Sequence, residues 1–173
     1  FNTPAGLDPS EALKHLRGVL PQTEVQFFNA TRVAGAEHLK MASINALRAV
    51  RTGVNISKSL AMETLLYASA QRQIDVAIEM LGVAHDCRTI SLVAFCESRS
   101  GAENVANKIA QSVGAQLDDT LLDRWSREKA TEIMAMYDID AREIEAIRMP
   151  GQDKNAAISK AVVERIALLS TRS

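Results

Sequence analysis

The sequence predicts a helix-rich α/β fold in which several helices cover a small mixed or antiparallel sheet. The chain has 173 residues, enough for one domain with a proper core. Apolar residues recur at helical spacing along most of the chain, whereas only two short segments resemble strands. We see no internal repeat, low-complexity tract or linker, so we treat residues 1–173 as a single domain. Because Phe1 is not an initiator methionine, we expect the natural chain to begin earlier, with a first strand or a tag.

The first predicted elements are a helix, a strand and a second helix. The first helix covers residues 8–20 and has Pro9 in its first turn. Residues 25–28 form a short apolar strand, and residues 36–50 form an amphipathic helix with Gly53 as its C-terminal cap. The apolar stripe of this second helix comprises Leu39, Ala42, Ala46, Leu47 and Val50.

Two shorter helices follow. One begins at Ser57 or Ser59 and ends near Ser69. The next spans residues 72–81 and ends at Gly82. Its expected inward face comprises Ile74, Ala77, Ile78 and Leu81.

Residues 89–96 give the strongest strand signal in the chain. Apolar side chains alternate onto both of its faces, which predicts a central strand with helices on each side. Cys96 is expected to be buried in this strand. The other cysteine, Cys87, makes no CxxC pair with it, so we expect two reduced thiols and a reducing compartment.

The C-terminal half is predicted to be helical. The expected helices cover residues 101–113, with Gly114 as a cap, and residues 121–137, 140–148 and 155–170. The second of them carries Trp125, Ile133, Met134 and Tyr137, and a loop at residues 149–151 precedes the last.

Sequence patterns of common enzymes are missing. The chain contains no GxxxxGK[ST] phosphate loop, HExxH zinc motif or GxSxG nucleophile elbow, and its three histidines are widely scattered. It has no apolar run near the ~20 residues that cross a bilayer and no basic-then-apolar leader. We therefore expect a non-catalytic cytoplasmic protein with no cofactor, no metal and no membrane contact.

Two weaker patterns allow other interpretations. The helix start at residues 99–102 could receive a phosphate, although simple helix capping also explains it. Asp118 and Asp119 resemble a carboxylate pair, but adjacent residues do not face each other, and a turn with a helix start is the alternative.

Positive charge is concentrated in one part of the chain. Residues 31–73 contain six basic and two acidic residues, a net charge of +4, whereas the whole chain has −1. Such a basic sector can orient a protein in the field of an anionic partner. The alternative is an ordinary solvated helix surface.

Short motifs along the chain resemble one protein family. They lie in residues 29–39, 55–82 and 163–169, and their order and spacing are similar to those of the small kinase-binding subunit of the KEOPS complex, called PRPK-binding protein in animals. The resembling residues are Asn29, Arg32-Val33, Glu37-His38-Leu39, Asn55-Ile56, Met62-Glu63, Leu65-Leu66, Arg72-Gln73-Ile74, Ala77-Ile78, Gly82 and Val163 to Leu169.

The resemblance implies a function in tRNA modification. KEOPS installs threonylcarbamoyl on an adenosine next to the anticodon, and a separate transferase subunit performs that chemistry. An atypical kinase with ATPase activity lies between the transferase and this subunit. The resemblance implies that this chain binds the kinase, supports its activity and captures the single-stranded 3′ CCA end of tRNA.

A site for such an RNA end can be placed on the sequence. Single-stranded RNA presents phosphates, base edges and faces for stacking, so its reader needs cations and small polar groups. Lys58 and Arg72 suit phosphates, and Arg72 could instead stack on a base. Asn55, Ser57 and Gln73 have a competing explanation as caps or turns, and Tyr67 is expected to pack in the core. The predicted RNA-binding residues are Asn55, Ser57, Lys58, Ser69, Arg72 and Gln73.

The last helix is the predicted partner surface. Its apolar residues cover a wide arc, so it either packs between other elements or offers a surface to the kinase. The predicted interface comprises Ala161, Val162, Arg165, Ile166 and Leu169. Two rival functions stay open: a purely structural kinase regulator without RNA binding, and a small acyl or phosphoryl transferase that uses the helix start at Arg99.

Overall fold

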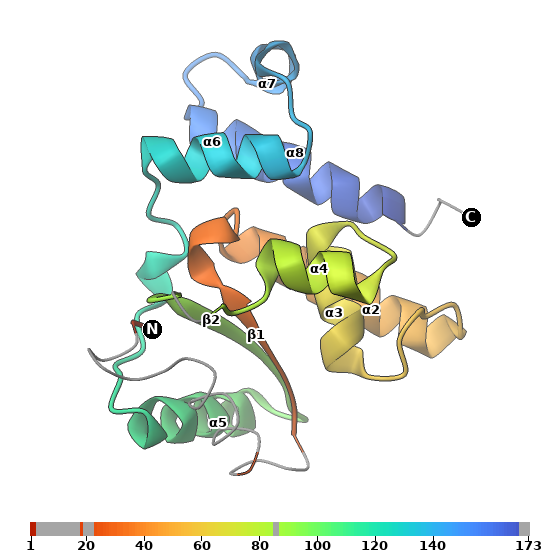
Figure 1. The fold of residues 1–173 in the computed structure, drawn as a ribbon, viewed down its shortest axis with the longest axis vertical. Coiled ribbons are helices and arrows are strands. Elements are labelled where there is room, and N and C mark those ends of the chain that lie inside the picture. Colours follow the sequence, from red (N-terminus) through yellow and green to blue (C-terminus); the bar gives the residue numbers. More distant parts are fainter. Residues whose placement is uncertain (3–17, 19–22, 85–86, 170–173) are drawn as a thin grey trace.

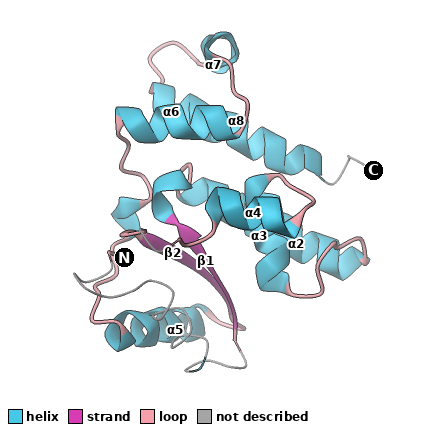
Figure 2. Cartoon of the chain, in the orientation of Figure 1, coloured by secondary structure: helices cyan, strands magenta, loops and turns pink. Residues whose placement is uncertain are grey.

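The described part of the protein is a two-stranded sheet with helices on both faces (Figures 1 and 2). A computed structural model describes residues 1–2, 18, 23–84 and 87–169, so the helix expected over residues 8–20 lies outside the described residues. The strands are β1 (Glu24–Asn29) and β2 (Ile90–Phe95). The helices are α2 (Ala36–Thr52), α3 (Leu60–Ser69), α4 (Ile74–Leu81), α5 (Arg99–Ser112), α6 (Arg127–Met136), α7 (Ala141–Ile147) and α8 (Lys154–Leu169). The predicted helix-rich α/β fold with a small antiparallel sheet is confirmed.

The sheet pairs β1 and β2 in antiparallel register, from Glu24 opposite Phe95 to Asn29 opposite Ile90. Among the described residues, the other edge of β2 is paired at its start, where Asn2 bridges Thr89 and Phe1 exchanges two hydrogen bonds with Ile90. The expectation of a central strand is confirmed at that end. The expectation for Cys96 was wrong, because β2 ends at Phe95 and Cys96 is exposed in the turn toward α5.

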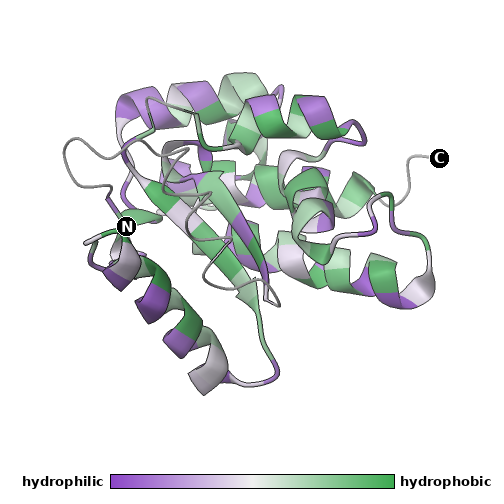
Figure 3. Cartoon of the chain, turned by 60° about the horizontal axis from the view of Figure 1, so that its bottom comes forward, coloured by the Kyte–Doolittle hydropathy of each residue, from purple (hydrophilic) through white to green (hydrophobic). Residues whose placement is uncertain are grey.

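The sheet separates two apolar cores, as its two-faced pattern predicted. The smaller core lies between the sheet and α5, and Figure 3 shows α5 beside the strands with hydrophobic and hydrophilic positions along its length. Phe28 of β1 belongs to the larger core, which α2, α3 and α8 share. The buried residues of the smaller core are Phe1, Phe27, Cys87, Ile90, Ile109 and Val113.

The predicted inward faces of α2 and α4 are only partly correct. Leu47, Val50, Ile74 and Ile78 are 39–47% exposed, although all four were expected to face inward. On α2, the side chains that face α3 and α8 are small, so the helix backbones approach closely. The larger apolar side chains Leu47 and Val50 lie beside this contact and are partly exposed. Its buried small residues are Ala42, Ala46 and Ala49.

The helix expected over residues 121–137 is two elements with a turn between them. A short 3-10 helix at Asp119–Leu121 is capped by the Asp118 side chain, and α6 begins only at Arg127. Ser126 caps α6, since its hydroxyl accepts the backbone N–H of Lys129 at 3.1 Å. Trp125 therefore lies before the helix.

A buried polar network joins three elements in the larger core. His38 of α2 is fully buried, and its Nδ1 accepts the backbone N–H of Ala34 at 2.9 Å. Its Nε2 therefore carries the proton and donates to the carbonyl oxygen of Ala68 at 2.8 Å. The Tyr137 hydroxyl donates to the same carbonyl oxygen at 2.7 Å. Burial lowers the pKa of His38 from 6.5 to about 4.

We expect stability to fall as the pH drops below 6.5. The pKa of His38 is about 4 in the folded protein and 6.5 in the unfolded chain, where the side chain is exposed to water. Between these two pH values the unfolded chain therefore binds one more proton than the folded protein. The stabilisation is fully present above pH 6.5 and is lost toward pH 4, with a total of about 3 kcal/mol at most. Urea unfolding at several pH values measures it. His38→Asn should flatten the pH dependence in this window; an unchanged slope would exclude His38 as its source.

Candidate functional site

A buried carboxylate shapes the loop between α2 and α3, residues 53–59. Glu63 of α3 is 0% exposed. Its Oε2 accepts the backbone N–H groups of Ile56 at 3.0 Å and Ser57 at 2.7 Å. Hydrogen bonds to a charged acceptor are stronger than neutral ones, so Glu63 fixes the loop and leaves Lys58 exposed at its tip. Glu63 is the one charged residue in the otherwise apolar α3, and this is the sequence signal that marks it.

A second carboxylate holds the start of α3. Oε2 of Glu24, on β1, accepts the Ser59 hydroxyl at 3.1 Å and the backbone N–H of Ala61 at 3.0 Å. The Ser59 oxygen in turn accepts the backbone N–H of Met62 at 3.3 Å, which confirms Ser59 as the cap. Negative charge is favourable at a helix N-terminus, so α3 begins here.

Asn55 and Ser57 take part in the turn before this cap. The Asn55 side-chain amide donates to the carbonyl oxygen of Ser57 at 2.9 Å. The Ser57 hydroxyl oxygen accepts the backbone N–H of Ser59 at 3.3 Å. These bonds confirm the turn alternative for Asn55, whereas the cap alternative for Ser57 is wrong, because Ser59 caps α3. Both residues are half-buried, so part of each side chain still reaches the surface.

The other end of α3 carries the second group of predicted RNA-binding residues. Ala70 ends the helix in the left-handed region, with φ of 52°, and the chain turns there toward α4. Arg72 and Gln73 are exposed, and Ile74 beside them is 39% exposed. Gln73 occupies the cap position of α4, but its side chain makes no capping hydrogen bond.

Ser69 lies in the core and not in this surface. It is 0% exposed, and its hydroxyl donates to the carbonyl oxygens of Leu65 at 2.9 Å and Leu66 at 3.1 Å. The Ser69 hydroxyl hydrogen is therefore already bonded within its own helix. Tyr67 is buried as expected. The expectation of a base contact from Ser69 therefore does not fit this structure.

The predicted RNA-binding residues form two groups and not one. Asn55, Ser57 and Lys58 precede α3, whereas Arg72 and Gln73 follow it. The helix has ten residues, and at 1.5 Å per residue its ends lie about 15 Å apart. One small ligand cannot contact both groups.

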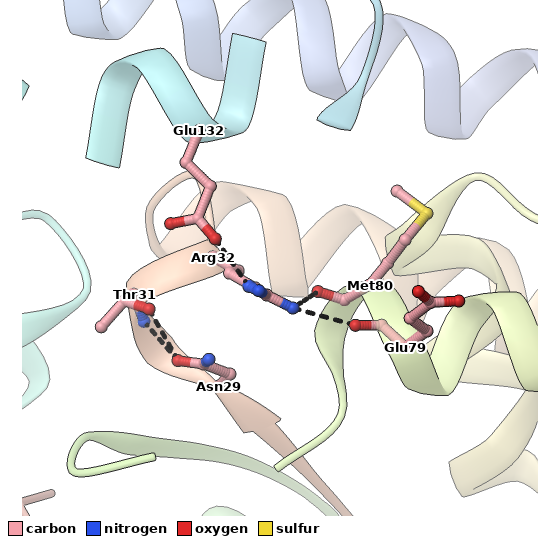
Figure 4. A network of polar contacts seen from close by, with 6 residues as sticks. All are labelled: Asn29, Thr31, Arg32, Glu79, Met80 and Glu132. Atoms are coloured by element: carbon pink, nitrogen blue, oxygen red, sulfur yellow. Dashed lines mark hydrogen bonds and ion pairs between the residues drawn. The ribbon is translucent and has the colours of Figure 1, made fainter. Parts of the chain in front are cut away.

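Part of the basic sector has a structural role (Figure 4). Nε of Arg32 lies 2.7 Å from Oε1 of Glu132 on α6. Its Nη1 donates to the carbonyl oxygens of Glu79 at 2.9 Å and Met80 at 3.2 Å, at the end of α4. Arg32 thus joins α4 to α6. The basic residues of the sector that are exposed are Lys40, which pairs with Glu37, and Arg48, Arg51, Lys58 and Arg72.

The predicted partner face of α8 is core. Ala161, Val162 and Ile166 are 0% exposed and Leu169 is 2% exposed. These side chains pack toward α2, α3, α6 and α7, which explains why they cover a wide arc. The interface interpretation was therefore wrong for these residues, because neighbouring helices of the same chain already cover them.

Arg165 of the same set joins α8 to α7. Its guanidinium makes a bidentate pair with Glu143, at 2.6 and 2.8 Å. It also donates to the carbonyl oxygens of Tyr137 at 2.7 Å and Asp138 at 2.9 Å. The pair lowers the pKa of Glu143 and raises the pKa of Arg165. Arg165 is thus engaged within the chain.

The two weak catalytic patterns have local explanations. The Ser98 hydroxyl accepts the backbone N–H of Gly101 at 3.1 Å, which confirms the capping alternative, and Arg99 pairs with Glu103 in solvent. Asp118 caps the 3-10 helix, as the turn alternative predicted. Across the described residues we find no group of three His, Cys, Asp or Glu suited to a metal. No helix in that same part of the chain has the length and apolarity to span a membrane.

Comparison with known proteins identifies the family. The family model described as kinase binding protein CGI-121 matches residues 9–170. The regulatory protein Cgi121 of Methanocaldococcus jannaschii is 31% identical over 147 residues, which cover 85% of this chain and 83% of the relative.

The chain belongs to the CGI-121 family of kinase-binding proteins. The match includes both ends of α3 and all of α8, so both predicted sites lie inside the CGI-121 region. The family that the sequence resembled is therefore confirmed. The M. jannaschii relative is named for regulation and not for catalysis.

We expect Glu63→Ala to destabilise this CGI-121 protein and to release its loop. The substitution leaves the backbone N–H groups of Ile56 and Ser57 without their acceptor. A fully buried donor would lose roughly 1–3 kcal/mol, and these partly buried donors should lose less. Urea unfolding gives the free energy, and amide hydrogen exchange reports on the loop. Glu63→Gln retains an acceptor oxygen and should lose less. Glu37→Ala, at an exposed pair, serves as the control; equal effects of both alanine variants would contradict the assignment.

Proposed function

We propose that this protein is the non-catalytic kinase-binding and tRNA-recruiting subunit of a KEOPS complex in the cytoplasm. The observation that carries the proposal is membership of the CGI-121 family, whose description names kinase binding. The chain would bind and support the atypical kinase and capture the 3′ CCA end of tRNA. The transferase subunit, an indirect partner, would make the bond between threonylcarbamoyl and adenosine. No cofactor is required for either binding role.

The exposed residues at the two ends of α3 support the RNA role. Lys58 presents a cation next to the half-buried polar groups of Asn55 and Ser57. At the other end, Arg72 and Gln73 offer a cation and an amide for a phosphate and a base edge. Because these groups lie apart, the tRNA end would contact them successively and would not sit in one pocket. Ser69 does not belong to the proposed site, since it is buried.

We expect Lys58→Ala and Arg72→Ala each to weaken tRNA binding, because each removes a phosphate contact. For single-stranded RNA, each lost contact should reduce the slope of log K against log salt by about 0.7. Stability should stay within ~0.5 kcal/mol, as for exposed residues. Fluorescence anisotropy over a salt series measures the binding.

Two controls make the RNA test specific. Lys160→Ala changes an exposed cation on α8 and should leave the affinity unchanged. A tRNA that lacks its three terminal nucleotides should bind less well than the full molecule. Equal binding of the trimmed tRNA would reject CCA capture. Absence of salt-dependent binding to either tRNA would leave the purely structural kinase regulator as the function.

The kinase contact needs a surface other than α8. On α2, Ile44 and Leu47 are 47% and 39% exposed and lie one turn apart. Arg48 and Arg51 border them. Exposed apolar side chains that gather beside charged groups are typical of protein interaction sites. We assign the kinase contact to this α2 stripe, defined as Ile44, Leu47, Arg48 and Arg51.

We expect the double variant Ile44→Asp, Leu47→Asp to bind the kinase at least about tenfold more weakly, a change of about 1.4 kcal/mol. Charge on the α2 stripe would be desolvated in the complex, whereas it is solvated in the free protein. Co-purification and calorimetry measure the loss. Met149→Asp, at a 66% exposed residue beyond α7, is the matched control. Undiminished kinase binding of the double variant would place the contact elsewhere.

A further inference from the structure

The backbone on each side of Lys58 is anchored to a carboxylate. Directly before Lys58, the backbone N–H of Ser57 donates to Oε2 of Glu63 at 2.7 Å. Directly after it, the hydroxyl of Ser59 donates to Oε2 of Glu24 at 3.1 Å. The side chain of Lys58 is exposed between these two anchors. The position of this cation is therefore determined by residues that precede and follow it, and both of them are held.

The two carboxylates come from different elements that pack together. Glu24 lies on β1 and Glu63 on α3, and these two elements are in contact. Oε2 of Glu24 also accepts the backbone N–H of Ala61 at 3.0 Å. Both carboxylate oxygens of Glu63 accept the N–H of Ile56, at 3.0 and 3.2 Å. The loop at residues 53–59 is thus bound to the sheet as well as to the helix that follows it.

The charge of these two residues does not suit an RNA site. A carboxylate near a lysine that binds phosphate repels the same phosphate. Glu63 is nevertheless 0% exposed directly beneath the loop, and its oxygens are occupied by backbone N–H groups. Any favourable effect of Glu24 or Glu63 on RNA binding must therefore arise from the geometry that they impose, and not from attraction.

We propose that Glu24 and Glu63 are positioning residues of the RNA site, which set the RNA affinity through Lys58 without contact with the RNA. This inference rests on the proposed RNA role of Lys58. A loop that is ordered before binding loses less conformational entropy when the ligand arrives, so affinity is higher. Without either anchor, the backbone around Lys58 would have to be ordered by the RNA itself.

A double-mutant cycle on tRNA binding tests the proposal. We expect Glu63→Gln to raise Kd about fivefold in the otherwise unaltered chain, because the loop must then be ordered on binding. In the Lys58→Ala background the same change should raise Kd less than about twofold, because the residue through which Glu63 acts is gone. A general folding defect would lower binding by the same factor in both backgrounds. Equal factors would therefore overturn the positioning role.

Two control variants make this cycle specific. In an Arg72→Ala background, at the other end of α3, Glu63→Gln should again raise Kd about fivefold, because distant sites act additively. Glu37→Gln removes an exposed carboxylate on α2 and should not weaken binding. Tighter binding of Glu63→Gln would show that its charge alone matters, and this outcome would also overturn the proposal.

Glu24→Gln repeats the cycle at an exposed residue, so the test does not depend on whether Glu63→Gln folds. It should weaken binding in the unaltered chain and much less in the Lys58→Ala background. The cycle also separates this inference from the proposed function. No effect of Lys58→Ala in the unaltered chain would reject the RNA site at Lys58 and the positioning role with it. A clear effect of Lys58→Ala, combined with equal factors for the glutamate variants, would reject the positioning role alone.

Discussion

One carbonyl oxygen in the core, that of Ala68, ties α2 and the end of α6 to α3. It accepts hydrogen bonds from His38 and Tyr137, which lie 99 residues apart in the chain. The two rings pack edge to face with centroids 5.8 Å apart. Because each member of a buried polar network satisfies the others, none can move alone without leaving an unpaired group. The network holds α3 between its neighbours and thereby fixes the positions of the exposed residues that precede and follow it.

Charged side chains serve the backbone in the same way elsewhere. Glu63 binds loop N–H groups, Arg32 binds the carbonyl oxygens at the end of α4, and Arg165 binds those after α6. Each closes a helix end or a turn that would otherwise have unpaired groups.

Apolar spacing predicted the described helices and both strands, because periodicity is a local property of the chain. It could not separate core from surface: Ile166 and Ile74 are chemically alike, yet one is 0% and the other 39% exposed. Which face a neighbouring helix covers depends on packing between distant segments. The same limit applies to polar groups, since Ser69 can bond within its own helix and only the fold shows that it does. Trp125 was expected inside a helix because it continues the apolar pattern, but the cap at Ser126 starts α6 one residue later, at Arg127.

The loop at residues 53–59 has a thermodynamic consequence for the two proposed partners. It joins the end of α2, which carries the α2 stripe proposed for the kinase, to the start of α3, and Lys58 is exposed within it. If tRNA shifts this loop, the end of α2 is displaced with it. Linkage then requires reciprocity: whatever factor the kinase imposes on RNA affinity, RNA imposes on kinase affinity. If both proposed binding events take place, the short connection between α2 and α3 would couple them.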